Sequence, residues 1–334
     1  MNAPRQRRRR QAGFTLIELM ISLVMFSFAI AGVLAVAVAM ASGFREQKQA
    51  ISSEGSSRAV MEFLADAIRG ASPGVIGGNS ATVEDISVAA GACPTGPFLF
   101  TDNSAAPDEL TILFAYGSVA TFSTTAAYSP RGASINVVDA TQFQAGDHVL
   151  ITNYLTGHLV RITSIAGSVL NLDTGSSCTI GVAATYAPGS LVVRAIRARF
   201  FVQALDGVPT LWMDPDAEGP GTAEPLAEGI EDFQVELGHD PGNDGISTVG
   251  AAADDDEWAG NHASDTAIPN VAWPATELIR AVRIYLVARS VAPVTGVGSF
   301  TRPPIGNRLG GGPDNYRRRV LNSVIEVRNL GGSP

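Results

Sequence analysis

Cysteine is scarce in this sequence, which contains Cys93, Cys178 and no other. The chain therefore has no CxxC pair and no cysteine spacing typical of a metal site. If the body of the protein lies outside the cytoplasm, one disulfide between the two, closing a long loop, is the expected state. The alternative is that both are unpaired, buried thiols.

Catalytic motifs are absent as well. The sequence has no GxSxG, HExxH or P-loop motif, and no GxGxxG followed by a suitable helix. Four histidines are scattered along the chain, and no two have the spacing of metal ligands on one helix or strand: they are His148, His158, His239 and His262. The sequence therefore predicts a protein that is not an enzyme and has no required cofactor.

Lys and Arg are missing from the long stretch between Phe200 and Ile279, and the formal net charge of the whole chain is −9. Five arginines fall within residues 5–10, so the rest of the chain has 18 basic and 32 acidic residues, a charge of −14. Such an acidic body argues against binding nucleic acid through a broad basic surface. The arginine run alone could be a nuclear signal, but an apolar segment follows it directly.

Acidic residues are dense within this stretch, in HDPGNDGISTVGAAADDDEW. The candidate calcium ligands are Asp240, Asp244, Thr248, Asp254 and Asp256. The first three fit positions one, five and nine of a calcium loop, and the last two could complete a site from the next turn. However, Gly242 and Ala251 stand where the third and twelfth ligands belong. Calcium binding and a solvated acidic loop are thus alternative readings.

Proline is absent between Pro4 and Pro73, and residues 14–41 carry one charge, Glu18. These 28 residues would form a helix of roughly 42 Å, long enough to cross a bilayer. Residues 42–70 continue as an amphipathic helix whose charges alternate in sign. Its apolar stripe consists of Val60, Met61, Leu64 and Ile68. We expect one continuous helix from Phe14 to Arg69.

The arginines before the apolar segment predict a single pass through the inner membrane, with a cytoplasmic N-terminus and an exported C-terminal body. A cleaved secretory signal fits poorly because such a signal has its small-residue cleavage site after the apolar region. Here the small residue, Gly13, precedes that region.

The exported body, residues 75–334, is rich in small residues and contains short β-type runs between turns. Residues 129–175 are expected to form a β-rich insertion. Later runs alternate clearly, as in SLVVRAIRARFFVQ and ELIRAVRIYLVARS. Their apolar faces need a cover, and the helical stripe is the obvious one. The predicted fold class is α+β, with a long N-terminal helix packed on an antiparallel sheet.

The segment RRRRQAGFTLIELMISLVMF resembles the class III signal of type IV prepilins and of type II secretion pseudopilins. The resemblance implies that prepilin peptidase removes residues 1–13 by cutting between Gly13 and Phe14, and that Phe14 is then N-methylated. Glu18 becomes the fifth residue of the mature chain, where the family uses this carboxylate to attract the N-terminal amine of a neighbouring subunit. The implied fold is pilin-like.

The C-terminal segments, from LAEGIEDFQVELGHD to YRRRVLNSVIEVRNLG, resemble PilW-type minor pilins. This implies a structural subunit in a tip complex that primes type IV pilus assembly. Its implied partners are minor and major pilins, the inner-membrane assembly platform and a tip adhesin, and its final location is the pilus on the cell surface. J-type pseudopilins of type II secretion share the plan and remain an alternative, as does a membrane-anchored periplasmic binding protein.

Overall fold

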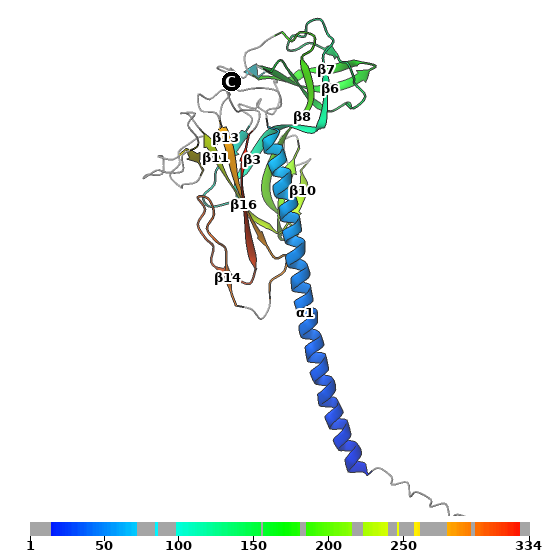
Figure 1. The fold of residues 1–334 in the computed structure, drawn as a ribbon, viewed down its shortest axis with the longest axis vertical. Coiled ribbons are helices and arrows are strands. Elements are labelled where there is room, and N and C mark those ends of the chain that lie inside the picture. The colour runs from blue at the N-terminus through cyan, green and yellow to red at the C-terminus, as the bar shows by residue number, and fades with distance from the viewer. Residues whose placement is uncertain are drawn as a thin grey trace, which may run out of the picture. The chain divides into compact units, whose positions relative to one another are not determined.

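One long helix, α1 (Leu16–Arg69), forms the N-terminal part of the protein (Figure 1). The computed structural model describes residues 15–71, 84–85, 98–154, 156–180, 185–215, 223–239, 246, 257–260, 279–294 and 298–327. The chain divides into two compact units, residues 1–51 and residues 52–334. The predicted continuous helix is confirmed from Leu16 to Arg69.

The first unit contains the apolar part of α1. Residues Leu16–Val38 are long and apolar enough, by length and composition, to cross a membrane. All of their side chains are exposed, including Leu16 at 78% and Phe28 at 74%. A helix that is apolar on every side is stable in water only when something covers it. No described residue of this unit covers the segment.

In the second unit the last turns of α1 belong to the core. Val60, Leu64 and Ile68 are buried, and the ring of Phe63 meets the rings of Phe114 and Phe200 edge to face. Three residues of the predicted stripe therefore lie on the buried face of the helix, and the fourth, Met61, is half-buried. Beyond Arg69, the carbonyl of Gly70 accepts a hydrogen bond from the backbone N–H of Ala115, which fixes the helix end to the sheet.

The larger sheet has ten antiparallel strands. They are β1 (Glu84–Asp85), β2 (Phe98–Thr101), β3 (Glu109–Phe122), β4 (Ser134–Asn136), β5 (His148–Thr152), β6 (Gly157–Ala166), β7 (Val169–Ile180), β8 (Leu191–Leu205), β9 (Val208–Asp214) and β10 (Glu224–Glu228). The long strand β8 pairs with β3, β5 and β9. Strands β4–β7, in the region expected as an insertion, thus join the main sheet through β5, although residues between 119 and 192 form a core cluster of their own.

The smaller sheet has the strand order β12–β11–β13–β16. Its strands are β11 (Ile230–His239), β12 (Trp258–Ala259), β13 (Ile279–Arg289) and β16 (Arg318–Glu326). As the alternation predicts, Val282, Ile284 and Leu286 are fully buried on one face. The other face is also covered in part, because the segment around β14 (Phe300–Thr301) and β15 (Pro313–Asp314) contacts β11 through arginines. This sheet therefore has two buried layers instead of one.

Truncating the buried stripe should loosen the whole second unit. We expect Leu64→Ala to lower the free energy of unfolding by about 2–5 kcal/mol, because a fully buried leucine leaves a cavity when it is removed. Denaturant unfolding of the detergent-solubilised chain measures this loss. The exposed neighbour Glu62 is the control, since Glu62→Ala should change stability by no more than about 0.5 kcal/mol. Equal losses in both variants would contradict the assignment of the buried face.

Candidate functional site

The start of α1 carries the first candidate site. The backbone N–H of Glu18 donates to Thr15 Oγ1 at 3.3 Å, and Thr15 Oγ1 lies 3.4 Å from Glu18 Oε2. Thr15 and Glu18 have the T-x-x-E spacing of a capping box, which satisfies donors that a helix start leaves unpaired. Glu18 therefore has a local structural role in addition to the implied role in assembly. The TLIE pattern could have revealed this role, but our sequence reasoning did not use it.

Glu18 sits on an otherwise apolar surface. Between residues 14 and 41 the sequence contains no Lys or Arg, so the carboxylate has no cation on its own segment. The serines nearby do not add unsatisfied groups, because the Ser22 and Ser27 hydroxyls donate to the carbonyls of Glu18 and Leu23 at 2.7 and 2.8 Å. A carboxylate in this setting is costly unless a positive group from elsewhere reaches it.

Several predicted site residues lie outside the described part of the chain. These are Gly13, Phe14, Cys93, Asp240, Asp244, Thr248, Asp254 and Asp256. The backbone of Cys178 lies in β7 opposite Leu159, and its side chain is not described. The cleavage site, the disulfide and the calcium loop therefore remain predictions.

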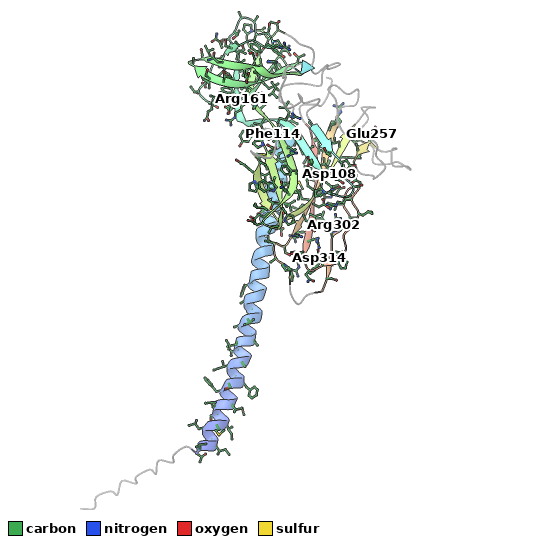
Figure 2. The ribbon with its side chains drawn as sticks, turned by 180° about the vertical axis from the view of Figure 1, so that it is seen from behind. Asp108, Phe114, Arg161, Glu257, Arg302 and Asp314 are labelled. Atoms are coloured by element: carbon green, nitrogen blue, oxygen red, sulfur yellow. The ribbon has the colours of Figure 1, made fainter. Side chains whose placement is uncertain are left out.

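A buried ionic cluster on β11 is the second feature, and the sequence reasoning missed it. Asp232 is fully buried, and its two oxygens lie 2.5 Å from Arg302 Nη1 and 2.7 Å from Arg308 Nη1. Nearby, the Asn307 side chain donates to Asp102 Oδ1 at 2.6 Å. The segment 302–308 is thus held on the outer face of β11 by charge, and Figure 2 labels Arg302 at this position.

Asp108 joins the two sheets. Its carboxylate accepts the backbone N–H groups of Asn103 and Val235, each at 2.8 Å, and its own N–H donates to the carbonyl of Phe233. Burial raises the pKa of Asp108 to about 8, against these two hydrogen bonds, which favour the charged form. The side chain is therefore protonated over much of the range in which an ordinary aspartate is ionised.

The arginine run before and within β16 has three separate roles. Arg317 lies over the ring of Phe300. Arg318 lies between two carboxylates: its Nε is 2.5 Å from Glu231 Oε2 and its Nη2 is 2.5 Å from Asp314 Oδ2. The hydrogen bond from Arg318 lowers the pKa of Asp314 to about 2. Arg319 forms an ion pair with Glu54 of α1. This last contact ties the end of the chain to the helix within the second unit.

Two family models match this sequence, one near its N-terminus and one in its C-terminal part. Residues 8–41 match the prokaryotic N-terminal methylation motif, and residues 199–329 match the type IV pilus-assembly protein W, PilW. The C-terminal region is thus similar to PilW, and the N-terminal region carries a methylation motif. The PilW match includes β9 to β16 and hence the acid–arginine contacts around β11.

Other comparisons add little to these two matches. A solved type IV-like pilin from Thermus thermophilus, TTHA1219, is 12% identical and aligns over 84% of this chain and 97% of its own, with a TM-score of 0.36. At that score the likeness does not by itself establish a shared fold. No curated protein matches the chain.

Removing Asp232 from the β11 cluster should strongly destabilise the head, that is, the second unit (residues 52–334). We expect Asp232→Ala to cost about 3–5 kcal/mol of unfolding free energy, because Arg302 and Arg308 would keep their charges without the shared partner. Chemical denaturation provides the measurement, and Glu228→Ala on the exposed side of β10 is the control. A loss as small as that of the control would show that the cluster does not hold this segment.

Asp108 should make stability depend on pH. Its folded pKa is raised above the ordinary value, so its contribution is complete below about pH 4 and is lost as pH rises toward 8. Asp108→Asn remains neutral at every pH. The stability of the parent chain relative to this variant should therefore fall between pH 4 and 8, by up to about 1.4 kcal/mol per pH unit. A constant difference across unfolding curves in this range would contradict the raised pKa.

Proposed function

We propose that the protein is a minor pilin that is anchored in the inner membrane by the apolar part of α1 and is then incorporated into a type IV pilus. The observation that carries this proposal is an exposed apolar helix with one carboxylate at its capped start. The methylation-motif match over residues 8–41 and the PilW match over residues 199–329 support it.

The same helix surface can be covered twice, first by lipid and later by the helices of neighbouring subunits. A span of 23 residues, Leu16–Val38, matches the thickness of a bilayer core. Because lipid tails and packed helices are both apolar, moving from one to the other does not require this surface to meet water. Van der Waals packing between helices then determines the position of the subunit among its neighbours.

Glu18 supplies the specific contact in this proposal. Cleavage between Gly13 and Phe14 removes all five leader arginines and exposes a new amine at Phe14. An unpaired carboxylate and an unpaired ammonium are both costly in an apolar medium, so bringing them together between two subunits removes much of both penalties. The Thr15 cap holds the start of the helix in place for this contact.

A position at the pilus tip, where the subunit would help prime assembly, is supported by the bulk of the head. The lobe formed by β4–β7 and its own core adds material that would be difficult to repeat along a tightly packed shaft. In this proposal the partners are prepilin peptidase, other minor and major pilins, the assembly platform and a tip adhesin, and the protein has no enzymatic role. The PilW match favours a pilus over a secretion pseudopilus.

The charge of Glu18 should be required for incorporation. In sheared surface filaments we expect the mature chain to begin at methylated Phe14, and Glu18→Gln to lower its recovery about tenfold or more, because the amine then loses its charged partner. Mass spectrometry of the filaments measures both the N-terminus and the amount. Glutamine keeps the size and the oxygen that the Thr15 cap uses, so the variant separates charge from capping.

The control is Ser22→Ala, one turn further along the helix, which should leave recovery unchanged. Equal membrane levels of all three chains would show that insertion is not affected. Normal recovery of the Gln variant, or a filament-bound chain that retains residues 1–13, would contradict the proposed function.

A further inference from the structure

The smaller sheet ends in an open edge. β16 is the last strand in the order β12–β11–β13–β16, and among the described residues it pairs with β13 alone. It is nine residues long and pairs without a bulge. It contains no proline and no lysine, two of the devices with which proteins protect edge strands. The opposite edge, β12, has two residues.

The register shows which main-chain groups face outward. The N–H of Val327 donates to the carbonyl of Arg280, and the N–H of Ser290 donates to the carbonyl of Arg317. In an antiparallel pair such hydrogen-bonded positions recur every second residue. Odd-numbered residues of β16 therefore point their backbone groups at β13. The outward-pointing residues are Arg318, Val320, Asn322, Val324 and Glu326.

Two of these outward-pointing residues, on either side of Asn322, are exposed valines. Val320 and Val324 are 40% and 54% exposed. Arg318 does not charge this edge, because its side chain is almost entirely buried between Glu231 and Asp314. Near the start of β16, Arg317 and Arg319 are exposed, and Glu326 is exposed at its end.

We propose that this edge binds a strand of a different pilin-type subunit, which adds to the sheet antiparallel to β16. The inference rests on the proposed function, because assembly through α1 would bring neighbouring heads side by side. The added strand has apolar residues facing Val320 and Val324. It is acidic at its C-terminal end, opposite Arg317, and basic at its N-terminal end, opposite Glu326.

The β16 strand of a second copy of this chain does not fit as the occupant. Arg319 at the start of β16 pairs with Glu54, and from there the strand runs beside the C-terminal part of α1 in the same direction (Figure 1). Antiparallel pairing of two β16 strands would therefore turn the two helices in opposite directions. Subunits that enter one membrane by their N-terminal helices have parallel helices, so the partner strand must run opposite to its own subunit's helix.

Photocrosslinking in cells tests this edge. A photoreactive amino acid replaces Val324 in the full-length chain, and sheared filaments are analysed by mass spectrometry. Val291, also an exposed valine (42%) but outside β16, is the matched control site. We expect crosslinks from position 324 to another pilin-type subunit, about tenfold more abundant than those from position 291.

A second experiment places proline at an outward-pointing position of β16. Asn322→Pro removes an N–H that points away from β13, so it should lower the position-324 crosslink about tenfold per incorporated chain and leave the melting temperature nearly unchanged. Ser323→Pro removes an N–H that β13 uses and should lower the melting temperature. Unchanged crosslinking in the Asn322 variant would overturn the inference.

The two proposals fail differently. If the parent chain is present in sheared filaments but position 324 crosslinks no more than position 291, the edge proposal alone is wrong. Crosslinks to a second copy of this chain, or to a protein that is not a pilin, also overturn it. Absence of the parent chain from filaments, with no crosslink, contradicts both the edge proposal and the proposed function.

Discussion

An apolar helix surface that its own unit leaves uncovered is the constraint on which the rest of this protein depends. The side chains of Leu16–Val38 are exposed on every side, although the segment has the length and composition of a membrane span. Lipid covers such a surface without any specific contact, and another helix covers it through close packing. One carboxylate in this setting changes the outcome, because Glu18 favours a neighbour that brings a positive group. The capped helix start and the all-apolar surface therefore act together.

Folding of the head pairs acidic and basic residues that are far apart in the sequence. Acidic residues of β11 lie in the stretch without Lys or Arg, whereas arginines are concentrated after residue 279. Folding brings the two blocks together, so that Asp232 meets Arg302 and Arg308, and Glu236 meets Arg283. Arg283 also lies over the ring of Trp258. The outer face of the smaller sheet becomes a buried polar layer, in which cations from later segments of the chain offset the cost of removing the acids from water.

The sequence predicted the parts of the fold that depend on local periodicity. The proline-free helix, its stripe at Val60, Leu64 and Ile68, and the alternation in β13 are confirmed. Contacts between distant segments could not be predicted, because periodicity does not identify partners. Asp108 and Val235 are 127 residues apart, and no local pattern indicates that the first would be buried against the backbone of the second. At Thr15 and Glu18 a local capping pattern was present in the sequence and was not predicted, whereas the assembly role of Glu18 remains a prediction.

Direction within the head limits how this subunit can meet its neighbours. The ion pair between Arg319 and Glu54 fixes the start of β16 to α1, so that the strand and the helix end run the same way. When helices are parallel, equivalent strands of identical subunits are also parallel, so β16 cannot pair antiparallel with the β16 strand of an identical subunit. A subunit that occurs once, between unlike neighbours, can carry such an edge without forming a continuous sheet along the filament.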